Sequence, residues 1–197
     1  MRSDTERNYR MLLRVAEEML AHSDETVTLT QIAKEANIAP ATAYRYFGSL
    51  DGLVTAFRVE VNRELMAFSE DCDAEGLDLL AAVCRRWVDL VDEHGHAMAQ
   101  VRSREGYLTR LRAAVPDIAS QAAAMRRPLA EAGRALGVPD AGDEALHLWN
   151  VLYDPRDILD LRATLGLSID ELAARLFSVL CAALTAWSAQ PSPPADR

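Results

Sequence analysis

The chain has 197 residues and a mass of 21.7 kDa, with 50% hydrophobic and 26% charged residues. This length can bury a sizeable core, and the composition is typical of a globular protein rather than a disordered one. The sequence has no apolar run of about 18 residues to cross a bilayer. Its first ten residues, MRSDTERNYR, lack the apolar segment of a secretory signal. We therefore expect a cytoplasmic protein without a membrane partner.

The formal net charge of −9 argues against a protein that coats nucleic acid without selectivity. The acidic excess is uneven, because residues 1–50 carry six basic and seven acidic side chains, a net charge of −1. The remaining residues carry a net charge of −8. The first fifty residues are therefore compatible with a DNA-binding segment.

Helical spacing of apolar residues recurs along the whole chain, and no segment shows the alternation of a strand, so we expect an all-α fold. A first helix is expected over about 5–22, ending near His22. Thr28 is a candidate N-cap for a second helix, with Gln31 completing a capping box. Asn37 tolerates the left-handed conformation that follows a helix. The sequence therefore predicts two helices with a short turn after the second.

Pro40 suits the first turn of a third helix, expected to reach about Tyr46 and to end at Gly48. Ser49 is a candidate cap for a fourth helix of nearly five turns. Further helices are expected over about 77–94, 97–113, 117–136, 143–163 and 168–189, about nine in all. Pro155 predicts a kink in the helix over 143–163. The proline-rich residues 191–197 are expected to form a disordered tail.

The segment over about 28–47 holds two short helices separated by a three-residue corner, a helix-turn-helix arrangement. Helices of this length are not stable alone, so the first helix must supply a packing surface. The outward face of the third helix would enter a major groove N-terminus first. Hydroxyl groups suit phosphate oxygens, and Arg45 suits a guanine edge or a phosphate. The candidate DNA-binding residues are Thr28, Thr30, Pro40, Ala41, Thr42, Tyr44, Arg45, Tyr46 and Ser49.

The stretch TLTQIAKEANIAPATAYRYFGSLDGL resembles the N-terminal domain of the TetR family of bacterial transcriptional regulators. Nine positions match the family pattern with unbroken spacing: Thr28, Ile32, Ala33, Ala36, Thr42, Tyr44, Phe47, Ser49 and Leu53. Ala39 stands where the family has a serine cap, and Leu50 stands where it has a lysine that contacts phosphate. These departures predict weaker nonspecific binding and a shallow salt dependence.

The resemblance implies a DNA-binding domain over 1–49 and a helical effector-binding and dimerisation domain over 50–190. The last two helices would pair with those of a second copy, and their broad apolar faces agree with this. A two-fold dimer would place two recognition helices about 34–36 Å apart on a palindromic double-stranded operator. The candidate dimer residues are Leu152, Ile158, Leu172, Leu176, Val179, Leu180, Ala183, Leu184 and Trp187.

The resemblance also implies a pocket among the middle helices for a small-molecule effector of unknown identity. The candidate effector-binding residues are Trp87, Val91, His94, Met98, Arg102, Tyr107, Met125, Trp149, Asn150 and Tyr153. Their mixture of aromatic and apolar types suggests an apolar or aromatic ligand. The fourth helix links this region to the DNA reader and would carry the switch. The expected function is a homodimeric repressor that an effector releases from its operator.

The same sequence is compatible with two other functions. The chain would also suit a regulator that activates transcription or senses a protein partner. Ala39 and Leu50 leave room for a helical ligand-binding or dimerisation protein with a weakened DNA reader. His94 and His96 lack the spacing of a metalloenzyme motif, and Cys72, Cys84 and Cys181 are too scattered for a zinc site. No nucleophile or phosphate-loop motif occurs, so we expect no metal, cofactor or catalysis.

Overall fold

The computed structural model describes residues 2–22, 27–100, 103–138 and 142–188. These residues form ten helices and no strand, which confirms the all-α fold. The helices are α1 (Arg2–His22), α2 (Leu29–Glu35), α3 (Pro40–Phe47), α4 (Leu50–Asp71), α5 (Gly76–Met98), α6 (Tyr107–Arg112), α7 (Pro116–Ala135), α8 (Gly142–Leu152), α9 (Pro155–Leu165) and α10 (Ile169–Ser188). The predicted tail over 191–197 lies outside the described residues.

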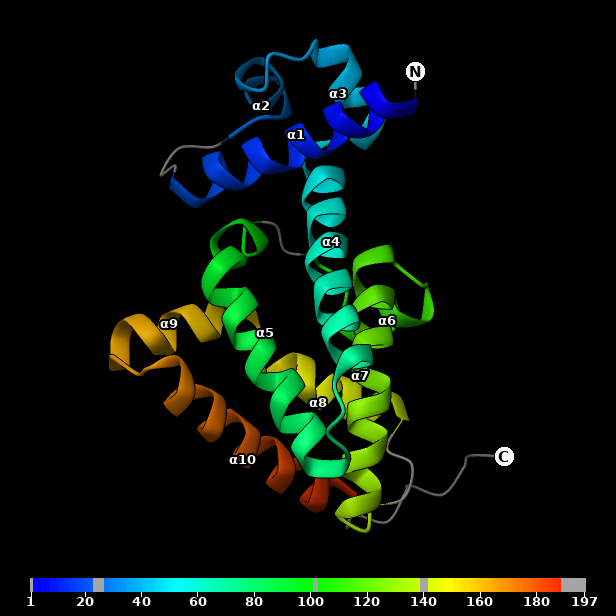
Figure 1. Cartoon of the computed structure of the whole chain (residues 1–197), viewed down its shortest axis with the longest axis vertical. Helices are drawn as coiled ribbons and strands as arrows, with labels where there is room; N and C mark the ends of the chain where they lie inside the picture. The colour runs from blue at the N-terminus through cyan, green and yellow to red at the C-terminus, as the bar shows by residue number, and fades with distance from the viewer. Residues whose placement is uncertain (1, 23–26, 101–102, 139–141, 189–197) are drawn as a thin grey trace.

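Helices α1–α3 form a small unit at one end of the molecule, and α5–α10 form a larger bundle at the other (Figure 1). Helix α4 spans both parts. It meets α1 and α3 near its start and packs along α5 and α7 over the rest of its length. Helix α4 is therefore the element that connects the small N-terminal unit to the bundle.

The local signals predicted for α2 are present. The backbone N–H of Gln31 donates to Thr28 Oγ1 at 3.3 Å, and the backbone N–H of Thr28 donates to Gln31 Oε1 at 2.8 Å. This is the expected capping box, which satisfies two otherwise unpaired N–H groups. Asn37 follows with a φ of 54°, the left-handed conformation expected of it.

Helix α3 begins at Pro40 as predicted, and Ala39 before it supplies no side-chain cap. Gly48 ends the helix with a φ of 72°, a region in which a residue with a Cβ is strained. Ser49 then caps α4, because its Oγ accepts from the backbone N–H of Gly52 at 3.0 Å. The start and end of α3 and the start of α4 were therefore predictable from the neighbouring residues.

Three predicted helices have different bounds. Helix α5 continues through Gly95 to Met98, and only Tyr107–Arg112 is helical in the predicted 97–113 segment. A Cβ built on Gly95 would lie 3.2 Å from Leu159 Cδ1, so the glycine permits close packing of α5 on α9 rather than ending α5. The predicted helix over 143–163 is broken rather than kinked. Asp154 caps α9, and Pro155 cannot donate to a continuing helix.

The core of the bundle holds an aromatic cluster between α5 and α8. The rings of Trp87 and Trp149 lie 5.3 Å apart, and Trp149 stacks on Tyr153 at 5.5 Å. The indole N–H of Trp87 donates to the Tyr153 carbonyl at 2.9 Å. All three cysteines are free thiols. Among the described helices, none is both long and apolar enough to cross a membrane.

Candidate nucleic-acid interface and effector cavity

Helix α3 presents one face outward and buries the other. Ala43 is fully buried and fixes the inner face, whereas Tyr44 remains 48% exposed and Arg45 and Ala41 are also exposed. Pro40 and Thr42 are half-buried. The predicted reading face is therefore accessible along the length of the helix.

Tyr44 and Thr30 lie close together at the junction of α2 and α3. Their hydroxyl oxygens are 3.5 Å apart, within hydrogen-bonding distance. Both residues were predicted to contact DNA, and this contact places their hydroxyls at one point of the surface. Two hydroxyls this close can both hydrogen-bond to the same phosphate oxygen.

Tyr46 has a different environment from Tyr44. Its ring packs edge-on against Tyr9 of α1 at 6.3 Å and against Phe47 at 6.2 Å, and Tyr9 lies 5.1 Å from Phe47. The Arg45 guanidinium lies 5.4 Å from the Tyr46 ring centroid. Tyr46 therefore packs α3 on α1, whereas the sequence-based prediction favoured an exposed residue that contacts DNA over a core residue.

Thr28 and Ser49 are exposed, but their hydroxyls are already engaged as helix caps. Thr28 Oγ1 donates to Gln31 Oε1 at 2.7 Å, and Ser49 Oγ accepts from Gly52. These hydroxyls fix the starts of α2 and α4. Their contribution to DNA contact would come through positioning of the flanking backbone.

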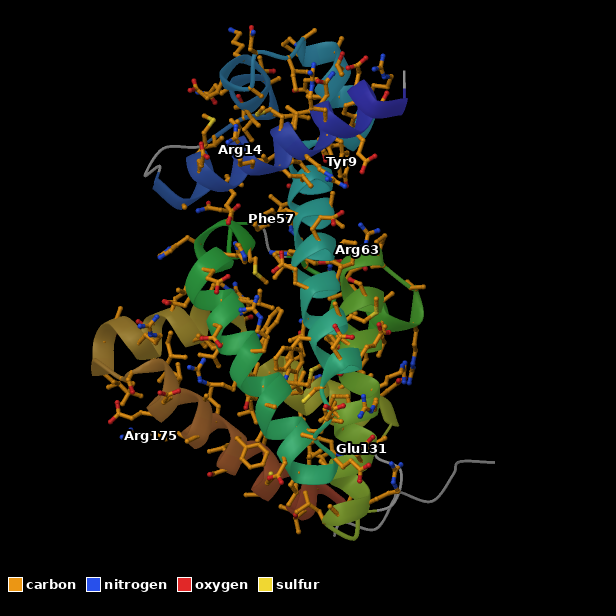
Figure 2. All side chains as sticks on the ribbon, viewed as in Figure 1. Tyr9, Arg14, Phe57, Arg63, Glu131 and Arg175 are labelled. Carbon is orange, nitrogen blue, oxygen red and sulfur yellow. The ribbon has the colours of Figure 1, made fainter. Side chains whose placement is uncertain are left out.

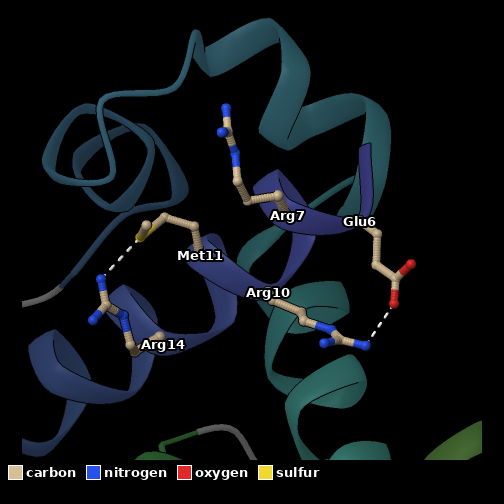
Figure 3. A pocket seen from close by; sticks show the side chains of 5 residues that line it. All are labelled: Glu6, Arg7, Arg10, Met11 and Arg14. Carbon is tan, nitrogen blue, oxygen red and sulfur yellow. Dashed lines mark hydrogen bonds and ion pairs between the residues drawn. The ribbon is translucent and has the colours of Figure 1, made fainter. Parts of the chain in front are cut away.

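A basic ridge on α1 was not among the predicted sites. Arg7, Arg10 and Arg14, with Glu6 and Met11, line a shallow hollow of about 480 Å³ (Figure 3). Arg10 pairs with Glu6 at 2.5 Å, and Arg14 lies 3.0 Å from the Met11 sulfur. The three arginines leave the helix in different directions, so they form a cationic surface rather than an enclosed site. Their spacing of three and four residues was the signal that could have shown it.

A larger cavity of about 720 Å³ lies within the bundle and is lined from α4, α5, α6, α7, α8 and α9. Of the ten predicted effector-binding residues, four line it: Trp87, Met98, Tyr107 and Asn150. Val91, Met125, Trp149 and Tyr153 are buried but are not part of its lining. Arg102 lies outside the described residues.

His94 is placed away from this cavity. It pairs through Nδ1 with Glu17 of α1, and its ring lies 6.0 Å from that of Phe57 on α4. Figure 2 shows Phe57 where α4 leaves the N-terminal unit. His94 is thus a structural link between α1, α4 and α5 rather than a lining residue. Asp92, two residues before it, pairs with Arg162 of α9.

The cavity contains charged groups that the sequence-based prediction did not include. Asp117 is only 3% exposed, and both its oxygens lie 3.0 Å from Arg110 Nη2. Arg58 Nη1 lies 3.5 Å from the same carboxylate, and Arg58 Nε donates to the Met98 carbonyl at 3.0 Å. Asn62 donates to the Asp117 carbonyl at 2.8 Å. This cluster joins α4, α5, α6 and α7 at one wall of the cavity.

The candidate dimer residues divide into two groups. Leu172, Leu176, Leu180 and Leu184 of α10 are buried within the protomer, as is Ile158 of α9. Val179 and Trp187 are about half exposed, at 50% and 49%, and Leu152 and Ala183 are intermediate. The five buried residues therefore form core contacts within one chain. The broad apolar face of α10 reflects two surfaces, one inside the protomer and one on its outside.

A short helix pair with an outward α3, held by α1 and joined through α4 to a helical bundle, defines a helix-turn-helix DNA-binding protein. Residues 12–57 match the family model described as bacterial regulatory proteins, tetR family. The chain thus carries the N-terminal domain of the TetR family and is a DNA-binding transcriptional regulator of that type, as its resemblance predicted. The match runs from the middle of α1 to Phe57 in α4. No curated protein matches the chain.

Proposed function

We propose that this protein is a homodimeric repressor that leaves its operator when a small molecule occupies the cavity of the bundle. The observation that carries the proposal is the position of α4. Arg58 and Asn62 of α4 line the cavity, while the start of the same helix meets α3. A ligand that prefers one position of α4 would therefore change the position of the reading helix.

The proposed division of labour places DNA binding in residues 1–49 and effector binding and dimerisation in residues 50–190. The reading surface would consist of α3 with Thr30 and the backbone at Thr28 and Ser49. The α1 arginines would add phosphate contacts. Two copies would bind a palindromic operator with reading helices about 34–36 Å apart. Such a regulator would act in the cytoplasm, where its DNA lies.

The outer face of α10 supports a dimer. Val179 and Trp187 are exposed there, and they alternate with small exposed residues such as Ala182 and Ala186. Ser178 and Thr185 donate their hydroxyls to their own helix, at Ala174 and Cys181, which leaves the face predominantly apolar. An apolar helix face of this kind is suited to close packing against a second copy.

Two further links join the N-terminal unit to the bundle. Glu17 of α1 pairs with His94 of α5, and Gln100 Nε2 donates to the Leu20 carbonyl at 3.1 Å. The end of α5 therefore moves together with α1, or these contacts break, when α4 shifts. These two contacts with α1 would therefore couple the cavity wall, which includes Met98 of α5, to the helix-turn-helix.

The test is a titration of the purified protein against DNA flanking its own gene, with fluorescence anisotropy at low salt and sedimentation to determine stoichiometry. We expect sequence-selective binding of two chains per site. Val179→Glu should dissociate the dimer and weaken operator binding, whereas Ala130→Glu on the exposed side of α7 should do neither. A monomer that binds its operator fully would contradict the dimer.

A second candidate is a ligand-binding helical protein whose DNA reader has weakened. The absence of a side-chain cap at Ala39 favours it, because a lost cap costs about 1 kcal/mol of helix stability. The same titration separates the two. No selective binding at low salt, without any ligand, would support the weakened reader.

A further inference from the structure

The cavity wall holds two guanidinium groups on one buried carboxylate. Arg58 and Arg110 are 18% and 16% exposed, and both contact Asp117, which is 3% exposed. Burial lowers the pKa of Arg58, and the Asp117 and Asp154 carboxylates offset this only in part. Two partly desolvated cations that share one anion leave local positive charge uncompensated.

The other charges around the cavity do not remove this excess. Asp154 is engaged by Arg156, with Nε to Oδ1 at 3.0 Å and Nη2 to Oδ2 at 2.5 Å. Arg104 and Glu105 are exposed at the rim and balance each other. Among the described lining residues, four arginines face three acidic side chains. The cavity is thus locally positive in a chain of net charge −9.

Several polar atoms of the lining are buried without a hydrogen-bond partner. They are Asn62 Oδ1, Tyr107 Oη, Gln121 Oε1 and His147 Nδ1. Burial raises the pKa of Tyr107 to about 12, so its hydroxyl stays protonated and can donate. Buried polar atoms of this kind normally have partners. Of these atoms, Tyr107 Oη can donate to an anionic ligand, whereas the two amide oxygens are acceptors and need a donor such as water.

The apolar part of the lining comes from Trp87, Met98 and Ile118. This surface favours a flat or apolar body of the ligand. A carboxylate brings one negative charge, which matches the excess of one, and its two coplanar oxygens suit a guanidinium fork. A phosphate monoester would bring close to two negative charges and overcompensate the site.

We propose that the effector is a monocarboxylate with a flat apolar body, and that its carboxylate binds Arg58 and Arg110 in competition with Asp117. The inference rests on the proposed effector-released regulator and names its ligand class. It also names the trigger. Arg58 fastens α4 to α5 through the Met98 carbonyl and to α7 through Asp117. A ligand that redirects the Arg58 guanidinium would break its contacts with the Met98 carbonyl and with Asp117, and α4 could then shift.

Calorimetric titration of the full-length protein with naphthoate, naphthamide and naphthylmethylammonium tests the ligand class, because the three share one body and differ in charge. Naphthoate should bind at least about tenfold more tightly than either, a difference of about 1.4 kcal/mol. Inorganic phosphate forms a separate arm and should not compete with naphthoate. Equal binding of the amide or the amine, no binding of naphthoate, or displacement by phosphate would overturn the proposal.

Variants change the charge excess in opposite directions. Arg110→Gln leaves Arg58 and Asp117 paired one to one, so the fold is kept while naphthoate binding falls at least about tenfold. Arg63→Gln, the same substitution at an exposed position of α4 outside the cavity lining, should leave binding unchanged. Asp117→Asn should tighten naphthoate binding if the variant folds. Equal loss in the two arginine variants would refute the assignment.

Operator affinity is measured separately from ligand binding. If naphthoate binds as expected but operator affinity does not change, the ligand class stands and release by the effector is wrong. If a neutral ligand releases the operator, release stands and the carboxylate assignment is wrong.

Discussion

The reading surface and the cavity use charge in opposite ways. The segment that must bind a polyanion exposes only Lys34 and Arg45 as cations on α2 and α3, whereas the cavity wall largely buries Arg58 and Arg110. Charge is screened on the surface but acts strongly where water is excluded. The difference indicates that shape and hydroxyl groups contribute more to DNA binding by α2 and α3 than cations do. The strong electrostatic discrimination is reserved for the interior.

The largest effect is expected from removing the buried anion. Asp117→Ala leaves the Arg58 and Arg110 guanidiniums without their shared partner, which should cost about 3–5 kcal/mol of unfolding free energy. Urea denaturation measures it. Asp170→Ala provides the control, because Asp170 pairs with Arg85 at a site where Asp170 is 83% exposed, and it should cost less than about 1 kcal/mol. Similar losses in both variants would contradict a difference between interior and surface charge.

A second expected effect concerns the reading face. Arg45→Ala should weaken binding to the operator by about 1–3 kcal/mol, because a guanidinium contact to a base edge or phosphate is lost. Lys34→Ala, on the exposed side of α2, should cost less. Anisotropy titrations of both variants at one salt concentration give the comparison. An unchanged affinity for Arg45→Ala would remove this residue from the interface.

Restoring the missing cap should have a smaller effect. Ala39→Ser gives α3 a side-chain acceptor at its N-terminus and should stabilise the protein by about 1 kcal/mol. The gain should appear as a higher denaturation midpoint with an unchanged slope. Ala41→Ser, within the first turn of the same helix, is the control and should bring no such gain. Equal stability of Ala39→Ser and the parent would show that Pro40 already compensates for the absent cap.

The smallest expected effect is on salt dependence. Leu50→Lys adds one cation at the start of α4 and should steepen the log–log salt slope of operator binding by about one ion. The parent chain should show a shallow slope. Each phosphate contact made by Arg7, Arg10 or Arg14 would add about one ion to this slope. A parent slope near ten ions would contradict a lightly charged reader.

Local features of the N-terminal unit were predictable because their causes lie within a few residues. The Thr28–Gln31 box, the left-handed Asn37 and the Ser49 cap each depend on neighbours in sequence. The family match confirms the identity of this unit. Tyr46 was harder, because its inward packing depends on Tyr9, a residue of another helix.

The cavity could not be predicted from sequence to the same degree. Asn62 and Asp117 are 55 residues apart, and no periodic pattern in the sequence predicts their contact. The aromatic residues Trp87 and Tyr107 were found because large apolar side chains mark an interior. Arg58 and Arg110 were missed because arginine is normally a surface residue. The end of α5 was predicted wrongly at Gly95 for a related reason. The role of this glycine depends on its packing against Leu159 of α9, which is distant in sequence.

The three tryptophans of the chain occupy two different surroundings. Trp87 and Trp149 form a pair beside the cavity, while Trp187 lies on the outer face of α10, where its indole N–H donates to Glu144 at 3.0 Å. A Trp187→Phe variant would confine the intrinsic fluorescence to the interior pair. The tryptophan fluorescence of the chain would thus report on the proposed cavity ligand and on the proposed subunit contact through separate indole rings.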